Sequence, residues 1–385
     1  MTCGKGLRGC WTGIARRTIV NQEPPRRVFR KNVMGKKRVL IDLRDMKKMT
    51  CGFGQIAKNY AERFAETKID GVQFVYLVPK NFKGQFGDVE CVKVRPKLNK
   101  YFPFTLPKVD LWHSITQQQK LRRIGGSTKF LLTIHDLNFL TEKGKLRQIK
   151  NTFFLQRKVD KADVIVTISH YVAEQVKSHL NLKGKDVRVI HNGVERIDQN
   201  ADRKPPFATG RPFFFTIGQI RKKKNFHLLL DVMKEFPETD LYICGDDHFK
   251  WAKTIRERIS EEGLTNVFLT GVISQEEKVW LYRNCEAFLF PSQGEGFGLP
   301  VIEAMQFGKA VFASNYTCLP EICSDKAFVW KDLRTETMVK SIRENLPGFY
   351  DNKQRVEDVR QYAYSFSYEK HINAYLQIYR ELLEK

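Results

Sequence analysis

The sequence has no apolar run approaching the ~20 residues that a helix needs to cross a bilayer, so we do not expect an integral membrane protein. Its eight cysteines stand at positions 3, 10, 51, 91, 244, 285, 318 and 323, and no two of them form a C-x-x-C pair. Cys244, for example, lies in the apolar segment LYICG, where a free thiol packs as a small hydrophobe. We therefore expect a reducing, cytoplasmic compartment.

Acidic residues are few relative to basic ones. The chain of 385 residues has 66 Lys and Arg against 43 Asp and Glu, a net charge of +23. Such an excess favours nucleic acid, an anionic membrane surface or phosphate-bearing ligands as partners. The basic residues are spread along the chain, and no helix-turn-helix, RRM, KH or zinc-finger pattern occurs, so we expect no nucleic-acid partner.

Residues 1–33 differ from the rest of the chain. They contain eight basic residues and one acid, Glu23, and they show no sustained hydrophobic period. An organelle transit peptide is one interpretation. The other, which we favour, is a disordered basic tail upstream of a start at Met34, because Met34 directly precedes the strand-like segment GKKRVLIDL.

Strand-like and helix-like segments alternate regularly after Met34. Amphipathic stretches at 55–66 and 170–180 lie between short apolar runs rich in β-branched and aromatic residues. These runs are RVLIDL (38–43), VQFVYLV (72–78), FLLTIHD (130–136), DVIVTIS (163–169) and VRVIHNG (187–193). The alternation predicts parallel βαβ units and an α/β fold.

The alternation stops once and then resumes. Residues 195–212 are polar, rich in Pro and Gly and without apolar period, which is typical of a linker. Further strands are expected at 212–218, 239–245, 267–272, 286–292 and 309–314, with helices near 225–235 and 250–262. We therefore predict an N-terminal domain over 35–200, a C-terminal domain over 205–365, and a terminal helix over 366–385.

The segment PSQGEGFGLPVIEAM (291–305) places two acids, Glu295 and Glu303, on either side of a glycine-bearing turn. Pro300 suits the first turn of a helix, so Gly296–Gly298 would present backbone N–H groups at a helix N-terminus. Such a site binds a phosphate or sugar oxygen, and both carboxylates could face it. The plainer alternative is that Glu295 caps a turn and Glu303 is a solvated helix residue.

The string P-S-x-x-E-G-F-G-L-P-V-I-E-A-M, followed by G-K-A-V-x-A-S and L-P-E-I, resembles the signature of retaining GT-B glycosyltransferases of the "glycosyl transferases group 1" type, which are family 4-like. The pair of glutamates separated by seven residues is its hallmark. Four other segments are similar to parts of that family: IHDLNF (134–139), VIHNGVE (189–195), FTIGQIRKKKNFHLLL (215–230) and YSFSYEKHINAYLQIYREL (364–382).

The resemblance implies a GT-B fold: two Rossmann-like domains that face each other across a cleft, with the C-terminal helix crossing back to the first. It implies a hexosyltransferase that moves a hexose, with mannose as the candidate by analogy, from a nucleotide-diphosphate sugar to a saccharide or lipid-linked acceptor with retention of configuration. The first domain would bind the acceptor and the second the donor. Cell-surface polysaccharide or lipopolysaccharide assembly would be the setting.

For the donor phosphates, the resemblance implies that Lys224 meets the charge of the departing diphosphate, near Gly218 and with Arg221 assisting. Family members often carry an arginine directly after the glycine that corresponds to Gly218, whereas this chain has Gln219. Whether Arg221 takes over that function stays open. The plain interpretation of residues 221–224 is a solvated basic run that caps a helix.

The resemblance also implies roles at the sugar and the base. Glu303 would hold the nucleotide ribose, and Glu295 and His135 would face the donor sugar as the catalytic residues. The remaining donor-binding residues would be Phe297, Gly298 and Leu299 through their N–H groups, Val272 near the base, and Gly52 and Gly54 near the diphosphate.

No D-x-D motif occurs, since Asp246–Asp247 is only a pair of adjacent acids, so we expect neither a metal nor a cofactor. A sugar-nucleotide epimerase on the same scaffold and a non-catalytic basic binding protein remain alternatives. A phosphorylase would need a pyridoxal phosphate lysine motif, which we do not find in the sequence. A nucleophilic serine or cysteine triad finds no support either.

The basic excess also suggests peripheral attachment to the inner face of the cytoplasmic membrane. The candidate surface combines KLNKYFPFTLPK (97–108), the cations Lys120, Arg122 and Arg123, and GKLRQIKNTFFLQRK (144–158). Aromatic and basic side chains together suit an anionic headgroup layer. The alternative is that the aromatics belong to the core and the lysines are merely solvated.

We predict that residues 1–33 are dispensable for folding. We expect a chain that begins at Met34 to unfold in the same cooperative transition as the full chain, because the removed segment has no hydrophobic period with which to join a core. Thermal denaturation followed by circular dichroism compares the two chains. Loss of the transition in the shorter one would show that the segment belongs to the folded structure.

Overall fold

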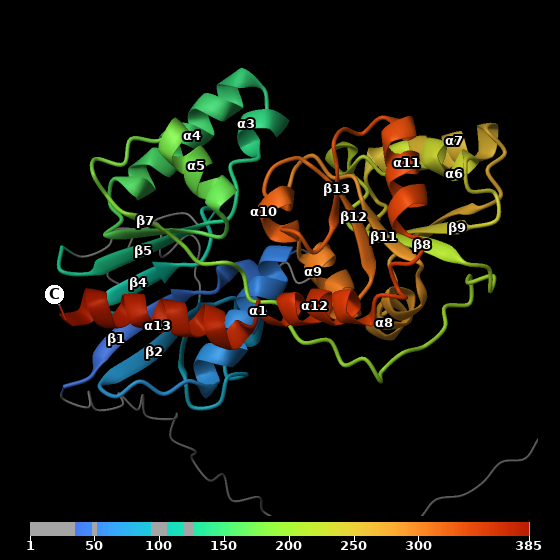
Figure 1. Cartoon of the computed structure of the whole chain (residues 1–385). Coiled ribbons are helices and arrows are strands. Elements are labelled where there is room, and N and C mark those ends of the chain that lie inside the picture. The colour runs from blue at the N-terminus through green and yellow to red at the C-terminus, as the bar shows by residue number, and fades with distance from the viewer. Residues whose placement is uncertain (1–34, 48–51, 94–105, 119–125, 385) are drawn as a thin grey trace, which may run out of the picture. The chain divides into compact units, whose positions relative to one another are not determined.

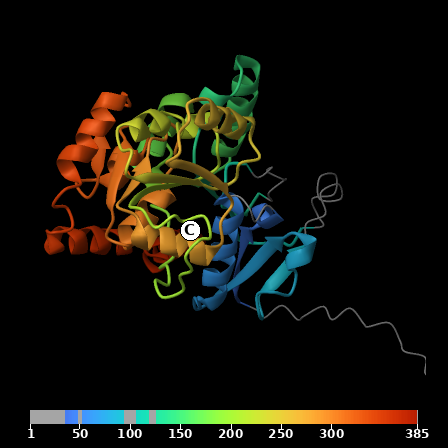
Figure 2. The same ribbon diagram turned by 90° about the vertical axis from the view of Figure 1, so that its right-hand side faces the viewer.

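The computed structural model describes residues 35–47, 52–93, 106–118 and 126–384. The chain divides into two units, residues 1–36 and 37–385, and the second contains every strand and helix described below. The tail predicted over 1–33 therefore lies outside the described residues. Within the second unit, two parallel sheets lie among helices, as the alternation in the sequence predicted (Figures 1 and 2).

The first sheet has seven parallel strands in the order β3-β2-β1-β4-β5-β6-β7. The order reverses between β1 and β4, which is the arrangement of a doubly wound fold. The strands are β1 (Lys37–Asp42), β2 (Val72–Val78), β3 (Glu90–Lys93), β4 (Leu111–Ser114), β5 (Lys129–Ile134), β6 (Val164–Thr167) and β7 (Val187–Val189).

The second sheet repeats this plan with six parallel strands in the order β10-β9-β8-β11-β12-β13, and its order reverses between β8 and β11. Because helices cover both faces, its four inner strands are almost completely buried and read as continuous apolar runs such as FFFTI, whereas the two edge strands are mostly half-buried. The strands are β8 (Phe213–Ile217), β9 (Asp240–Cys244), β10 (Val267–Gly271), β11 (Ala287–Phe290), β12 (Ala310–Ser314) and β13 (Phe328–Trp330).

Helices connect the strands in both halves. Those around the first sheet are η1 (Arg44–Lys47), α1 (Gly52–Glu66), η2 (Lys80–Phe82), α3 (Phe139–Glu142), α4 (Lys145–Val159) and α5 (His170–His179). Later in the chain come η4 (Lys222–Lys224), α6 (Leu228–Lys234), α7 (Lys250–Glu261), α8 (Gln275–Asn284), α9 (Leu299–Gln306), α10 (Leu319–Cys323), α11 (Thr335–Asn345), α12 (Lys353–Tyr364) and α13 (Tyr368–Glu384). Among the described residues, no helix is both long and apolar enough to span a bilayer.

The strands and helices that the sequence predicted are present in the structure, although some of their ends differ. The helix expected from residue 225 begins three residues later, at Leu228, because Asn225 adopts the left-handed conformation (φ 54°) that ends η4. The short strands β3, β4 and β13 were not predicted, and neither were the helices α4, α8, α11 and α12. The boundary predicted near residue 200 falls between the two sheets, and the division into two domains stays a prediction.

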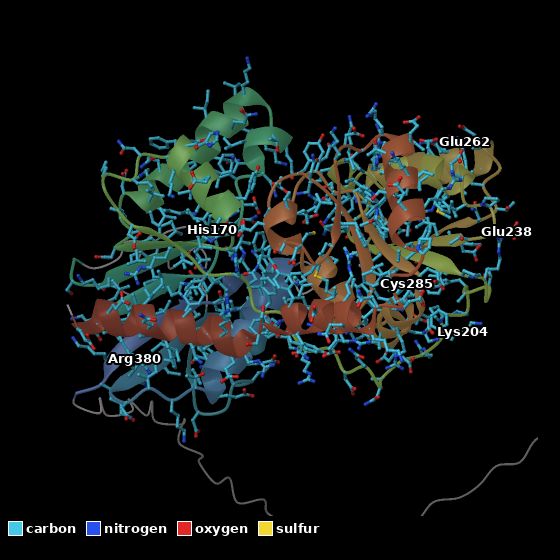
Figure 3. The ribbon with its side chains drawn as sticks, in the orientation of Figure 1. His170, Lys204, Glu238, Glu262, Cys285 and Arg380 are labelled. Atoms are coloured by element: carbon cyan, nitrogen blue, oxygen red, sulfur yellow. The ribbon has the colours of Figure 1, made fainter. Side chains whose placement is uncertain are left out.

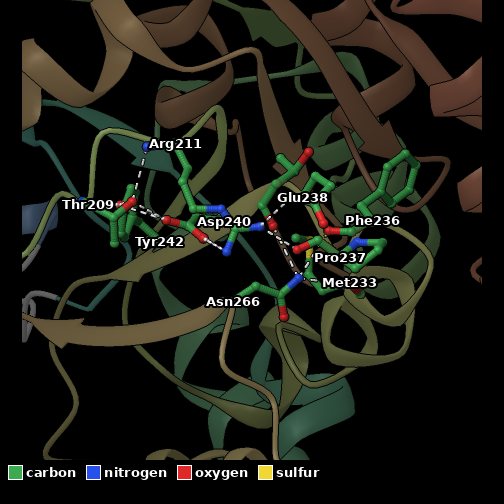
Figure 4. Close-up of polar contacts among 10 residues, drawn as sticks. Thr209, Arg211, Met233, Phe236, Pro237, Glu238, Asp240, Tyr242 and Asn266 are labelled. Carbon is green, nitrogen blue, oxygen red and sulfur yellow. Dashed lines mark hydrogen bonds and ion pairs between the residues drawn. The ribbon is translucent and has the colours of Figure 1, made fainter.

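The polar segment 195–212 connects the sheets and is bonded along its length to the second one. The Thr209 hydroxyl donates to Asp240 Oδ2 at 2.5 Å, and Arg211 pairs with Asp240 Oδ1 at 3.4 Å, which compensates a fully buried carboxylate at the start of β9 (Figure 4). Nearby, Asn266 Nδ2 donates to the carbonyls of Met233, Phe236 and Thr239 within 3.1 Å. The segment is therefore a structured part of the second half.

The chain passes between the halves twice, and the two passages touch. The Val194 N–H donates to Phe366 O at 2.7 Å. A Cβ on Gly193 would lie 2.8 Å from the Tyr368 Cα, so only glycine allows this approach. From there α13 returns to the first sheet and packs on it beside α1, as the family resemblance implied (Figure 1).

A buried polar network joins α13 to the first sheet. His113 on β4 bonds Tyr379 Oη at 2.7 Å and Thr133 Oγ1 at 2.9 Å, and Thr133 bonds Tyr375 Oη at 2.9 Å. A second histidine, His371, bonds His191 O at 2.6 Å and Tyr60 Oη at 2.8 Å. Burial lowers the pKa of His371 to about 4 and the pKa of His113 well below its usual value. Both rings are therefore neutral at physiological pH.

We predict that acid weakens this docking of α13. Since the pKa of His371 in the folded protein, about 4, lies below the unfolded value of 6.5, its stabilisation is complete above pH 6.5 and is lost as the pH falls towards 4. The loss should be on the order of 3 kcal/mol from this group alone. Urea denaturation at pH 7, 6, 5 and 4 measures it.

The variant His371→Gln should flatten that pH dependence, because the amide does not titrate. The control His179→Gln changes an exposed histidine on α5 and should leave the slope as it is in the wild type. A wild-type free energy of unfolding that stays level between pH 6.5 and 4 would contradict the prediction.

Candidate functional site

A salt bridge stands at the point where the strand order of the second sheet reverses. Lys224 follows β8 and Glu295 follows the neighbouring strand β11, and their Nζ and Oε1 atoms are 2.5 Å apart. Both side chains are largely buried, with 12% and 13% of their surface exposed. The carboxyl ends of parallel strands at such a reversal are where open α/β sheets bind ligands. The sequence placed both residues in one site, and the structure brings them together.

Backbone contacts fix the loop that carries Lys224. Asn225 Nδ2 donates to Pro291 O at 3.1 Å, and the Gln293 N–H donates to Lys223 O at 2.8 Å, so the loops after β8 and β11 are tied to each other. Gly218 lies beneath the Lys224 side chain, since a Cβ there would be 3.5 Å from Lys224 Cε. The basic run 221–224 therefore does not simply extend into solvent.

The glycine turn after Glu295 touches the first half of the chain. A Cβ on Gly296 would lie 2.2 Å from the His135 carbonyl oxygen, so no other residue fits there without movement. Gly296 O also accepts a hydrogen bond from the Ser169 hydroxyl at 3.0 Å. Gly298 (φ 95°) then begins α9, with Pro300 in the first turn as the sequence indicated. His135 and the Glu295 loop are therefore adjacent.

His135 follows β5 and its imidazole is buried, with 3% of its surface exposed. Its Nε2 lies 2.8 Å from Ile115 O, and because a carbonyl can only accept, Nε2 carries the proton. Burial lowers the pKa of His135, so the ring is neutral and Nδ1 carries the lone pair. A neutral ring with an accepting nitrogen can bind a hydroxyl group.

Sequence reasoning missed two residues around His135. The Gln117 side chain accepts the His135 N–H at 3.0 Å and donates to Asp136 O at 2.9 Å, and the Gln117 carbonyl accepts a hydrogen bond from Lys158 Nζ. Burial lowers the pKa of Lys158 to about 8. No local pattern distinguishes these residues, because Gln117 lies in a polar run and Lys158 stands among other basic residues of α4.

Thr317, also missed, supports the Glu295 loop from β12's side. Its hydroxyl accepts the Glu295 N–H at 3.3 Å and donates to Tyr316 O at 2.7 Å. Its backbone is left-handed, with φ 57°, which a β-branched residue rarely adopts. Such strain is typical of functional loops.

Glu303 lies one turn into α9 and has a different set of partners. Lys278 Nζ is 3.2 Å from Oε1, and the Tyr282 hydroxyl donates to Oε2 at 2.9 Å. With 22% of its side chain exposed, it is not a freely solvated helix residue. The structure thus places both glutamates on one loop and helix, each beside a lysine.

The other residues expected at a donor site lie in varied surroundings. The Arg221 guanidinium stacks 4.3 Å from the Phe249 ring centroid, and its buried Nε has no hydrogen-bond partner among the described residues. Gly52 and Gly54 lie in the first turn of α1. The Phe297 side chain is core, Leu299 opens α9 and Val272 is 70% exposed. Nothing in these contacts tests their expected roles.

Among the described residues, one group of three side chains has the spacing of metal ligands: His170, His191 and Glu321, whose ligand atoms all lie within 4.8 Å of one another (Figure 3 labels His170). The Glu321 carboxylate accepts the N–H groups of His170 and Tyr171 at 2.8 and 3.0 Å and bonds His191 Nε2 at 2.8 Å. Burial raises the pKa of Glu321, but these bonds outweigh it and lower the pKa overall. Glu321 of α10 therefore caps α5 from the opposite half.

The arrangement suits an anionic ligand that carries hydroxyl groups. Lys224 supplies a charge, the N-terminus of α9 supplies N–H groups, and Glu295 and His135 supply acceptors for hydroxyls. None of these groups is a placed nucleophile of the serine or cysteine type.

Two family models match adjacent parts of the chain. "Glycosyltransferase Family 4" matches residues 56–196, and "Glycosyl transferases group 1" matches residues 198–366. The boundary between the two matches falls in the segment that connects the two sheets.

Curated relatives include mannosyltransferases. A serotype-specific mannosyltransferase of Escherichia coli is 27% identical over 224 residues, which cover 53% of this chain but only 27% of that protein. The chain thus spans about a quarter of that relative's length. The O-antigen chain mannosyltransferase C of Escherichia coli is 24% identical, and the match covers 74% of this chain and 76% of the relative.

Solved structures share the fold. Sucrose-phosphate synthase from Thermosynechococcus elongatus superposes with a TM-score of 0.70 at 16% identity, covering 91% of this chain and 100% of that one. An Anabaena protein solved in complex with UDP-glucose gives 0.67 at 15% identity, covering 90% and 100%.

We predict that Lys224 and Glu295 are strongly coupled. Removal of one partner, by Lys224→Met or Glu295→Gln, leaves a group in a largely buried place without its counter-charge, and the double variant should recover part of the loss. The coupling energy from a double-mutant cycle should be about 1–3 kcal/mol. Chemical denaturation of the four proteins measures it.

The exposed pair Lys253 and Glu257, 3.5 Å apart on α7, is a matched control that should give no more than about 0.5 kcal/mol. Equal coupling in both cycles would show that the pair at the strand reversal has no special environment.

Proposed function

The chain belongs to the glycosyltransferases of GT-B fold whose first half matches family 4 and whose second half matches group 1, and from this premise we propose that it transfers a sugar from a nucleotide-diphosphate donor. The observation that carries the proposal is the buried pair Lys224 and Glu295 at the strand reversal of the second sheet. A cation, an N–H-bearing helix start and a carboxylate meet there, and a nucleotide sugar offers a diphosphate and hydroxyls.

In the proposed complex, Lys224 and the N–H groups at the start of α9 bind the diphosphate. Lys224 already pairs with Glu295. The incoming diphosphate therefore replaces the carboxylate as a partner of the Lys224 ammonium group, and the Glu295 carboxylate turns to the sugar. There it accepts hydrogen bonds from sugar hydroxyls or stabilises positive charge that develops at the anomeric carbon. Glu303 accepts the ribose hydroxyls. Lys224 and the N–H groups at the start of α9 stabilise the negative charge of the leaving diphosphate, so the proposal includes no metal.

His135 completes the sugar site from the first half. Its backbone carbonyl touches Gly296, and the neutral ring keeps Nδ1 as an acceptor for a sugar hydroxyl. The first half would then bind the acceptor. Transfer with retention needs the diphosphate to leave and the acceptor to attack on the same face of the sugar. A short-lived ion pair between an oxocarbenium-like sugar and the leaving group would allow this without a placed nucleophile.

We propose a hexose donor, with mannose favoured by the mannosyltransferases among the relatives, and a role in cell-surface polysaccharide synthesis in the cytoplasm. Two alternatives have the same residues available: a sugar-nucleotide epimerase, and a protein that binds nucleotide sugars without turnover. Product analysis separates them, because an epimerase changes the donor sugar in the absence of any acceptor and a pure binding protein leaves it unchanged.

The two glutamates should differ in their effects on kinetics. We expect Glu303→Gln to raise KM for the donor roughly 10-fold or more, through loss of a charged hydrogen bond to the ribose. Glu295→Gln should instead lower kcat, since its proposed interaction forms with the transition state. Steady-state kinetics with varied donor measure both.

Glu261→Gln, at the exposed end of α7, is the control for the loss of one carboxylate and should change neither constant. A Glu303 variant with wild-type KM together with a Glu295 variant at full kcat would sink the assignment of roles.

A thermal-shift screen against UDP- and GDP-sugars tests donor binding and identifies the base. A donor present at ~100 times its Kd stabilises the folded state by about 2.7 kcal/mol. The shift should be much smaller for Lys224→Met at the same concentration. If no nucleotide sugar raises Tm in the wild type, the proposed function is wrong.

A further inference from the structure

Helix α4 carries an exposed apolar patch. Leu146, Ile149, Phe153 and Phe154 are 85, 68, 58 and 49% exposed, and among the described residues they account for four of the six exposed large hydrophobic side chains. Figure 1 shows α4 at the outside of the layer of helices over the first sheet. A group of this kind on one helix is unusual for a soluble surface and indicates a partner.

The spacing places these side chains on the outer side of the helix. Residues 146, 149, 153 and 154 follow the helical period, so they share one broad face. The opposite side of α4 holds the helix in place, because Leu155 and Val159 are buried and Lys158 Nζ donates to Gln117 O. The patch therefore belongs to a helix that is anchored.

Basic side chains flank the patch. Lys145, Arg147, Lys150 and Arg157 are exposed on the same helix, and residues 145–159 contain no acid. The Arg157 guanidinium lies 5.9 Å from the Phe153 ring centroid. The acids at either end of α4 are engaged elsewhere, since Glu142 pairs with Lys223 at 2.7 Å and Asp160 with Lys183 at 2.9 Å. The outer face thus combines apolar side chains with uncompensated positive charge.

We propose that this face of α4 lies in the headgroup layer of an anionic lipid membrane, with the four apolar side chains at the acyl boundary and the cations on lipid phosphates. An interfacial helix has this composition: a basic flank around Phe and Leu residues. The proposal does not depend on sugar transfer, because α4 contributes no group to the Lys224 and Glu295 site.

Other occupants fit less well. A second copy of this chain would bring four like charges against these four, and residues 1–33, with eight bases and one acid, would also be repelled. Nucleic acid would satisfy the cations but would leave aliphatic side chains such as Leu146 and Ile149 against phosphates. A surface that is both anionic and apolar satisfies both sets.

This inference narrows the surface expected from the sequence. Lys158 is buried and is not part of it. Residues 97–105 and 120–123 lie outside the described residues. Of the segment 97–108, residues 106–108 are described, and Lys108 is exposed. Of the three candidate segments, α4 is therefore the one whose surface the structure supports.

The test is co-sedimentation of the full chain with vesicles of phosphatidylglycerol and phosphatidylcholine, compared with pure phosphatidylcholine, at low and high salt. We expect binding to the anionic vesicles that weakens with salt. Lys150→Gln with Arg157→Gln should weaken it about 30-fold, since each basic residue at such a surface contributes roughly five-fold. Leu146→Ser, Ile149→Ser and Phe153→Ser together should weaken it roughly 100-fold.

The control is Lys253→Gln with Lys340→Gln, which removes the same net charge from exposed positions on α7 and α11 and should retain wild-type binding within a few-fold. Circular dichroism melting of every variant excludes unfolding as the cause. No binding to anionic vesicles at low salt would overturn the proposal, and so would an equal loss in the control. A dimer that the serine variant abolishes, without vesicle binding, would assign the face to a second copy.

Discussion

The constraint on which the site depends is that every paired strand in both sheets runs parallel. Parallel strands need a crossover after each strand, so all carboxyl ends of a sheet lie along one edge. Where the strand order reverses, the loops after two neighbouring strands leave towards opposite faces and open a space between them. In the second sheet that space receives Lys224 from one loop and Glu295 from the other, and their pair is a direct result of the topology.

The site also depends on contacts between the halves. Gly296 lies against the His135 carbonyl and accepts a hydrogen bond from Ser169, while Glu321 caps the first turn of α5 and bonds His191. Each of these contacts joins a strand end or helix start of one half to a loop or short helix of the other. Contacts from both halves therefore determine the conformation of the Glu295 loop, and they place His135 of the first half beside it.

How much the sequence predicted depends on how far each signal is local. Buried parallel strands such as VQFVYLV and FFFTI and amphipathic helices such as α13 are long enough to identify alone, and the turn from Gly296 to Pro300 specifies its own geometry. The strand β4 has only four residues, LWHS, and its His113 is a polar residue in a buried position. The hydrogen-bond partners that allow this burial come from β5 and α13, which are distant in the sequence. Lys158 looks like its basic neighbours until the packing of α4 buries it. Likewise, the left-handed backbone of Thr317 reflects tertiary contacts that the neighbouring residues in the sequence do not indicate.

The return of α13 to the first sheet has a consequence for synthesis on the ribosome. The face formed by Tyr60, Phe64, Phe74 and Tyr76 is completed by residues 372–382, which are translated only after the whole second half. Domains usually fold as they emerge, N-terminal first, yet here a nascent first half would wait with an uncovered aromatic surface and with His113 lacking its Tyr379 partner. Chaperones would have the whole elongation time to bind it. The first half is therefore completed only after the second half has been made.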